Sequence, residues 1–156
     1  MGDLTFNVAL GRAVEFYQRV RNNDPANSAL VLVVLKAPGA SDATLRDLTT
    51  LSAVLAASPE ATNAGYARKV LTDTTLAASS PDNTNDAWQI TFPPQTWNTV
   101  AATGGAWARL LVCYDSDTTT GTDANIIPVT AHDLPVTPNG TNIQVTPPAT
   151  GFYRAT

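Results

Sequence analysis

Charged residues are scarce in this sequence. They make up 14% of the 156 residues, whereas about a quarter is usual for a globular domain. The nine lysines and arginines are scattered along the chain, and the formal net charge is −4. Because nucleic acids and anionic membrane surfaces are bound by clustered cations, the composition predicts neither as a partner.

Cysteine and long hydrophobic runs are scarce as well. The single cysteine, Cys113, excludes an internal disulfide and a cysteine-based zinc site, and its apolar neighbours favour a small buried residue. The longest apolar stretch, ALVLVVLKA at residues 29–37, is too short to span a bilayer. The first residues, MGDLTFNVALGR, lack the features of a secretory signal. Hydrophobic residues nevertheless reach 44%, enough for the core of a single domain covering residues 1–156.

The first third of the chain is patterned for helices around one buried strand. Residues 7–24 are predicted to form a helix with Asn7 as its N-cap. Its buried stripe would consist of Ala9, Ala13, Phe16, Tyr17 and Val20. The valine-rich run 29–37 indicates a strand buried on both faces. Residues 41–57 predict a second helix, capped by Ser41. Its stripe would consist of Leu45, Leu48, Leu51 and Leu55.

After residue 65 the hydrophobic period changes from helical spacing to alternation. Short strands are predicted at 67–73, 87–92, 96–102, 106–114, 125–137 and 141–146. Hairpin turns are expected at Thr103-Gly104-Gly105 and at Asn139-Gly140, a pair that suits a type I′ turn. Pro128 and Pro135 cannot donate to a β-ladder, which favours an edge position or an interruption for their strand. These features predict a β-rich α+β fold, an antiparallel β-sandwich or small barrel with one or two helices in the N-terminal half.

The stretch LLVCYDSDTTTGTDANIIPVTAHD at residues 110–133 holds the candidate metal ligands. Asp115, Asp117 and Asp123 alternate like the start of a calcium loop. An EF-hand, however, needs Gly at position six and Glu at position twelve, where this sequence has Thr120 and Ile126. A solvated turn whose side chains bond their own backbone is therefore favoured over a weak Ca²⁺ site, and no cofactor is predicted.

The same stretch contains Cys113 and His132, the components of a thiolate–imidazole pair. Cys113 lies in the middle of a predicted strand, where burial would raise its pKa. Asp133 would point to the opposite face of its strand from His132 and is poorly placed to orient the imidazole. The chain also has no nucleophile elbow, Walker A, zinc-protease or dinucleotide motif. The sequence therefore predicts a protein that is not an enzyme and has no catalytic residues.

The three tryptophans admit two interpretations, an aromatic platform for sugars or packing in the core. Trp88 and Trp107 lie in predicted strands with apolar partners, which favours the core. Trp97 follows FPPQT and is expected to expose one face to solvent.

Five segments of the sequence carry a family resemblance. They are LTFNVALGRAVEFYQRVRNNDPANSALVLVVLKA, YARKVLTD, PDNTNDAWQITFPPQTW, LLVCYDSDTTTGTDANIIPVTAHD and the terminal GFYRAT. Together they cover nearly the whole chain, which resembles a small family of virion structural proteins found in tailed bacteriophages and prophages. That family has no catalytic motif, so the resemblance implies a role without site residues.

The resemblance implies a minor tail-associated or capsid-decorating protein that acts through protein–protein contacts. Its partners would be other virion proteins, tail or capsid subunits, and further copies of itself in a homo-oligomer. Such a protein is made in the cytoplasm of the host bacterium and incorporated into the virion. The sequence leaves the choice between tail and head open, and the alternative function is that of a carbohydrate-binding module used in host-surface adhesion.

Overall fold

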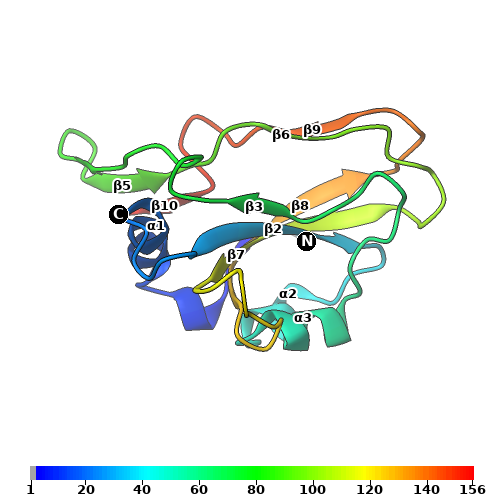
Figure 1. Ribbon diagram of the computed structural model, residues 1–156, viewed down its shortest axis with the longest axis horizontal. Coiled ribbons are helices and arrows are strands. Elements are labelled where there is room, and N and C mark those ends of the chain that lie inside the picture. The colour runs from blue at the N-terminus through cyan, green and yellow to red at the C-terminus, as the bar shows by residue number, and fades with distance from the viewer. Residues whose placement is uncertain (1–2) are drawn as a thin grey trace.

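The computed structural model describes residues 3–156 and is built around a five-stranded antiparallel sheet (Figure 1). Its strands, in order across the sheet, are β1 (Leu4–Thr5), β8 (Ile127–Val136), β7 (Trp107–Asp115), β2 (Ala29–Lys36) and β3 (Lys69–Leu71). The long strands β2 and β7 lie at the centre, where every residue but Lys36 is buried. The buried strand predicted at 29–37 is therefore confirmed, because a continuous run of branched side chains can be covered on both faces.

Two smaller antiparallel sheets lie over one face of this central sheet. One contains β4 (Pro81–Asp82), β5 (Ala87–Ile90) and β10 (Tyr153–Ala155), and the other pairs β6 (Gln95–Trp97) with β9 (Ile143–Val145). Figure 1 shows the β6–β9 pair above the central sheet, and β5 with β10 beside α1 (Ala13–Arg21) at one end. The predicted β-rich α+β fold with antiparallel pairing is confirmed, and the architecture is an open sheet covered on both faces.

The helices are shorter than predicted. Helix α1 is preceded by a 3-10 helix (Asn7–Ala9), and Gly11 separates the two with a φ of +75°, a left-handed conformation that suits glycine. Asn7 is not the expected N-cap, because its side chain donates to Asp47 instead (2.7 Å). The predicted stripe of residues 9, 13, 16, 17 and 20 is nevertheless buried.

The second predicted helix is also divided. Its segments are α2 (Asp42–Arg46) and α3 (Leu51–Ala57). Ser41 caps α2 as predicted, accepting a hydrogen bond from the Thr44 amide (3.2 Å), and Thr50 caps α3 by accepting one from the Ala53 amide (3.2 Å). The described residues therefore contain three α-helices rather than one or two.

Both predicted hairpins are wrong in their strand pairing. The turn at residues 103–105 follows β6, yet β6 pairs with β9 and not with β7. Gly104 has a φ of +125°, and a Cβ there would lie 2.8 Å from the backbone of Asn63. The buried Asn63 side chain in turn donates to the carbonyls of Ala101 (2.9 Å) and Gly105 (3.1 Å).

The Asn139-Gly140 turn also fails to join two paired strands, because β8, before it, does not pair with β9, after it. Its Gly140 amide donates instead to the carbonyl of Val100 (2.8 Å). Each turn carries the chain from one sheet to another. The expected irregularity at the prolines is confirmed, because the register of β7 and β8 shifts beside Pro128. On its outer side, strand β8 pairs with β1 at Thr130 and Ala131, and its Val129 carbonyl accepts from the Phe6 amide (3.0 Å).

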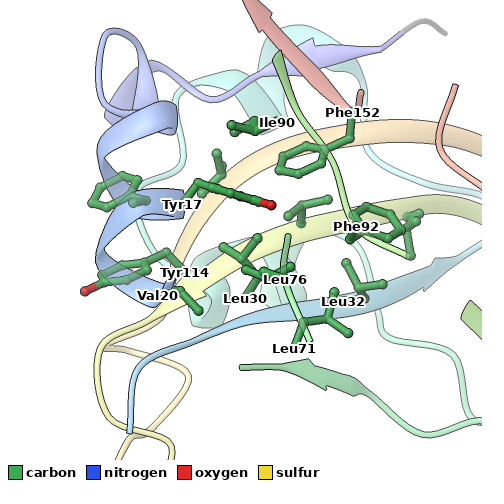
Figure 2. Packing of buried hydrophobic residues seen from close by; sticks show 14 of the residues in the cluster. Tyr17, Val20, Leu30, Leu32, Leu71, Leu76, Ile90, Phe92, Tyr114 and Phe152 are labelled. Atoms are coloured by element: carbon green, nitrogen blue, oxygen red, sulfur yellow. The ribbon is translucent and has the colours of Figure 1, made fainter. Parts of the chain in front are cut away.

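The two faces of the central sheet have separate hydrophobic cores. On one face, Leu45, Leu51 and Val54 of the helices pack on Val31, Val33 and Leu111. On the other face, side chains from α1, β2 and the chain's C-terminal segment converge, and Figure 2 shows Tyr17, Leu30, Leu32, Phe92 and Phe152 among them. Burial of each of the large apolar side chains in these cores contributes about 1.5–3 kcal/mol to the free energy of unfolding.

Trp97 is only 1% exposed, so the prediction that it would show a face to solvent is wrong. Because β6 folds down onto the central sheet, the indole packs edge-on against Trp107 with ring centroids 5.6 Å apart. Its Nε1 donates to the carbonyl of Ala67 (2.7 Å), which satisfies the polar end of the buried ring.

Candidate functional site

In the aspartate-rich loop that follows β7, the carboxylates of Asp115 and Asp117 accept hydrogen bonds from amides and hydroxyls of the loop itself. Asp117 accepts hydrogen bonds from the Thr119 amide (3.0 Å), the Thr119 hydroxyl (2.6 Å) and the Thr120 hydroxyl (2.5 Å). These bonds lower the pKa of Asp117 to about 2. Asp115 is 5% exposed and accepts from the Asp117 amide (3.0 Å). The geometry is that of successive Asx turns.

Asp123, at the end of the loop, is bound to Arg68. The guanidinium of Arg68 donates from Nη1 to Oδ1 (2.6 Å) and from Nη2 to Oδ2 (3.0 Å) of Asp123. It also holds Glu60 through Nε (2.9 Å) and Nη2 (2.7 Å). These hydrogen bonds lower the pKa of Asp123.

The three candidate metal ligands, Asp115, Asp117 and Asp123, therefore face different partners. Across residues 3–156, no group of three or more His, Cys, Asp or Glu side chains could hold a metal ion. Arg68 holds the end of the loop through Asp123.

Cys113 and His132 lie on opposite faces of the central sheet. Cys113 is fully buried in the core on the helix side, and burial raises the pKa of its thiol. His132 lies opposite Leu110, which belongs to the core on the other face. The alternation of side chains along β7 therefore separates the two residues, and the structure does not bring together a thiolate–imidazole pair.

His132 instead contacts Asp3 and Thr130. Its Nδ1 donates to Oδ2 of Asp3 (3.1 Å), and its Nε2 is hydrogen-bonded to the hydroxyl of Thr130 (2.9 Å). Thr130 and His132 are two residues apart on β8 and so share a face. Asp3 reaches them because β1, which it precedes, pairs antiparallel with β8 through Leu4 and Ala131.

Asp3 is the residue that joins the N-terminal strand to this group. Its Oδ1 accepts a hydrogen bond from the amide of Asp133 (3.1 Å). Partial burial alone would raise its pKa, but the hydrogen bonds from His132 and from Asp133, with the nearby charge of Arg109, lower it overall. These contacts favour the ionised form of Asp3 and hold it beside His132.

These side chains line a hollow of about 230 Å³ at the outer edge of the central sheet, which we name the His132 hollow. Asp3, His132 and Asp133 lie at its polar end, with the Asp133 side chain directed to the opposite face of the sheet toward Arg109. Its apolar walls are Phe92, Leu110, Val145, Pro147, Pro148 and Phe152. The Phe152 ring meets the imidazole edge-on with centroids 6.4 Å apart. The hollow therefore combines an acidic end with walls that carry no charge.

Arg109 lies behind the polar end and is completely buried. Its Nη2 is paired with Asp42 at the start of α2 and lies 3.8 Å from Oδ1 of Asp133. Sequence reasoning missed Asp3 and Arg109 as contributors. An arginine inside the apolar run WARLLVCY was the available signal, because a buried guanidinium needs carboxylate partners.

The order Asp3–His132–Thr130 has the connectivity of a carboxylate–imidazole–hydroxyl relay. Thr130, however, is only 2% exposed, so its hydroxyl is poorly placed to attack a substrate. The exposed residues that line the hollow are Asp3, Asp133, Thr146 and Pro148.

Trp88 is the tryptophan that remains partly exposed. Its Nε1 donates to the hydroxyl of Ser79 (2.6 Å), and it borders a shallow depression with Asp82 and Asn83. Asp82 already accepts hydrogen bonds from the Thr84 and Asn85 amides (3.0 and 3.2 Å) and from the Asn85 side chain (2.7 Å).

Comparisons of this chain with protein-family models, with curated proteins and with solved structures found no match. Within the described residues, none of the helices has the length and apolar character needed to cross a membrane. The candidate site is therefore interpreted from its own geometry.

Proposed function

We propose that this chain is a non-enzymatic structural component of a tailed-phage virion, a minor tail-associated or capsid-decorating protein that acts through protein–protein contacts. The resemblance of its sequence to such proteins supports the role, and its low charge supports contact surfaces that are not ionic. The structural observation that carries the proposal is the open edge of the central sheet at β3.

The edge at β3 exposes backbone hydrogen-bonding groups. On β2, the Val34 carbonyl accepts from the Ala61 amide (2.9 Å), and the Val34 amide donates to the Tyr66 hydroxyl (3.0 Å). The backbone N–H and C=O groups of the even-numbered residues of β2 therefore point toward the β3 side. In an antiparallel ladder the pairs Leu30–Leu71 and Leu32–Lys69 then exchange hydrogen bonds, and the backbone N–H and C=O of Val70 point outward. Such an edge is a template for another strand.

The side chains at this edge suit an interface. Val70 is 51% exposed, although it is a large apolar residue. Lys69, the type of residue that usually protects an edge from pairing, lies instead over the ring of Trp97, with Nζ 5.4 Å from the centroid. An identical β3 from a second copy, related by a two-fold axis through Val70, would form two hydrogen bonds and cover both valines.

Strand pairing at β3 predicts that Val70→Lys weakens assembly. Light scattering at high protein concentration should show oligomers for the natural chain and a lower mass for Val70→Lys. Leu10→Lys is the matched control, because Leu10 is the other large exposed apolar residue within residues 3–156 (58%) and lies outside the edge.

The virion role itself is tested by mass spectrometry of purified particles from a phage or prophage that encodes the chain. The proposal predicts the protein among the particle components, with Val70→Lys incorporated less than Leu10→Lys. Its absence from the particles, or incorporation unaffected by Val70→Lys, would contradict the proposal.

A carbohydrate-binding module used in host adhesion is the second candidate. The partly exposed ring of Trp88 favours it, since aromatic faces stack on sugars. A glycan array tests it: binding that is lost in Trp88→Ala would support this candidate, and an array without binding would remove it.

A further inference from the structure

Asn139-Gly140 is the only Asn-Gly pair in the sequence, and both residues are exposed in the turn between β8 and β9. The backbone nitrogen of a residue can attack the side-chain amide carbon of a preceding asparagine, because the chain itself keeps the two groups together. Glycine hinders this attack least, since it has no Cβ. Apart from Gly140 and its two chain neighbours, no heavy atom of residues 3–156 lies within 4 Å of where a Cβ of Gly140 would stand. The turn therefore has room for the attack.

Two donors of Thr141 hold the amide oxygen of Asn139. This oxygen, Oδ1, accepts hydrogen bonds from the Thr141 amide (3.1 Å) and from the Thr141 hydroxyl (2.6 Å). When a nitrogen attacks the side-chain carbon of Asn139, negative charge develops on Oδ1. Donors that already point at such an oxygen stabilise the charge, as they do in an oxyanion hole. The folded turn therefore favours the attack at this side chain.

One hydrogen bond opposes the reaction. The Gly140 amide donates to the carbonyl of Val100 (2.8 Å), and the nitrogen can attack only after this N–H is released and loses its proton. The Val100 amide in turn donates to the carbonyl of Thr141 (3.0 Å). A further bond runs from the Thr99 amide to Oδ1 of Asn142 (2.9 Å). Local opening of the turn away from Val100, without global unfolding, must therefore precede the attack.

We propose that Asn139 is a site of spontaneous covalent modification, at which the folded turn promotes deamidation through a cyclic imide. Hydroxide removes the Gly140 amide proton, and the nitrogen forms a bond to Cγ of Asn139. The Cγ–Nδ2 bond breaks, and Nδ2 leaves as ammonia with a proton from water, which regenerates hydroxide. Water then opens the imide at one of its two carbonyl carbons and leaves aspartate or isoaspartate at position 139. No group is oxidised or reduced, and water is the only reactant consumed.

Either product changes the turn that carries it. Both add a negative charge, and isoaspartate also places a Cβ in the main chain, which displaces the Gly140 amide from the carbonyl of Val100. The strand that follows, β9, is short and is held in its sheet by β6. We expect modified chains to pair β6 with β9 less firmly. This inference stands independently of the proposed function, so failure of either leaves the other in place.

Mass spectrometry of the aged protein tests the site. The full chain is kept folded in mildly alkaline buffer and digested at mildly acidic pH, and every peptide that contains asparagine is sequenced by fragmentation. Asn139 should deamidate faster than any other asparagine, and more slowly when the protein is aged in mildly acidic buffer, because the attacking nitrogen must lose a proton. Faster deamidation at another asparagine, or an intact Asn139 after the isolated peptide has been converted, would overturn the inference.

Variants at Thr141 test the part played by the folded turn. Thr141→Val removes the hydroxyl donor and keeps the shape of the side chain, so deamidation of Asn139 should slow about three- to tenfold. Thr141→Ser keeps the hydroxyl and is the matched control, with a rate near that of the natural chain. A merely structural role of Thr141 predicts the opposite result, since a loosened turn would release the Gly140 amide more often. Unchanged or faster deamidation in Thr141→Val would show that the folded turn does not promote the reaction.

Discussion

The aspartate-rich loop and the His132 hollow are both acidic, yet their carboxylates are used differently. In the loop, Asp117 accepts hydrogen bonds from threonines two and three residues away, and Asp123 is held by Arg68. In the hollow, Asp3 accepts hydrogen bonds from His132 and from the Asp133 amide, both on a strand far away in the sequence. The loop acid Asp117 is therefore satisfied by its sequence neighbours, whereas Asp3 is satisfied by groups that the pairing of β1 with β8 brings to it.

The largest effect is expected at Arg68. Arg68→Met leaves Glu60 and Asp123 facing each other without their shared guanidinium, so the free energy of unfolding should fall by about 1–3 kcal/mol. This figure is reduced for solvent screening, because the three side chains are 28%, 22% and 38% exposed. Urea denaturation measures the loss.

Arg19→Met is the matched control for Arg68→Met. Arg19 also binds a glutamate, Glu15, at 2.9 Å, but both side chains are nearly half exposed. Solvent screens this pair, so its loss should lower the free energy of unfolding much less than Arg68→Met does. Equal costs for the two variants would show that Arg68 does not pin the loop.

Acid should destabilise the loop over a defined range of pH. The folded-state pKa of Asp117 is about 2 and that of Asp123 is also lowered, both below the ~3.9 of an unfolded aspartate. Groups of this kind add stability above the unfolded pKa and lose it as pH falls through the folded pKa. The Tm should therefore decline from about pH 4 to pH 2, and the decline should be shallower in Asp123→Asn. An unchanged slope in that variant would contradict the Arg68–Asp123 contact.

Replacement of His132 should have a local effect on the hollow. His132→Gln removes the bond that holds Asp3, at a cost of about 0.5–1.5 kcal/mol. Asp3 then loses its orientation toward the Asp133 amide, so hydrogen exchange of that amide should accelerate while amides at 115–123 keep their rates. Faster exchange in the loop instead would mean that the two regions are coupled.

Calcium should have the smallest effect. Because the carboxylates of Asp117 and Asp123 are engaged by threonines and Arg68, the Tm in millimolar Ca²⁺ should lie within about 1 °C of the Tm in chelator. A clear rise in Ca²⁺ that is lost in Asp117→Asn would show that the loop opens to bind the ion.

The elements that depend on local pattern could be predicted from the sequence. The run 29–37 is a buried strand, residues 9–20 bury the expected stripe, and Ser41 caps a helix. The pairing of β6 with β9 could not be predicted from the sequence. A Gly-Gly or Asn-Gly turn fixes the local backbone, but it does not determine which sheet the chain joins next.

The His132 hollow could not be predicted from the sequence for a related reason. Cys113 and His132 are close in sequence but fall on opposite faces, and the partner of His132 proved to be Asp3 rather than Asp133. Only the register of β1 on β8 brings Asp3 and His132 together. Register depends on long-range packing, which a single sequence does not display.

One amide-shift map compares the two acidic regions directly. ¹H–¹⁵N spectra are recorded for the natural chain, for His132→Gln, and for the natural chain with Ca²⁺. The account predicts that His132→Gln shifts the amides around Asp3, His132 and Phe152 and leaves residues 115–123 in position, and that Ca²⁺ shifts neither region. Shifts in the loop caused by His132→Gln, or Ca²⁺-induced shifts at Asp115, Asp117 and Asp123, would contradict it.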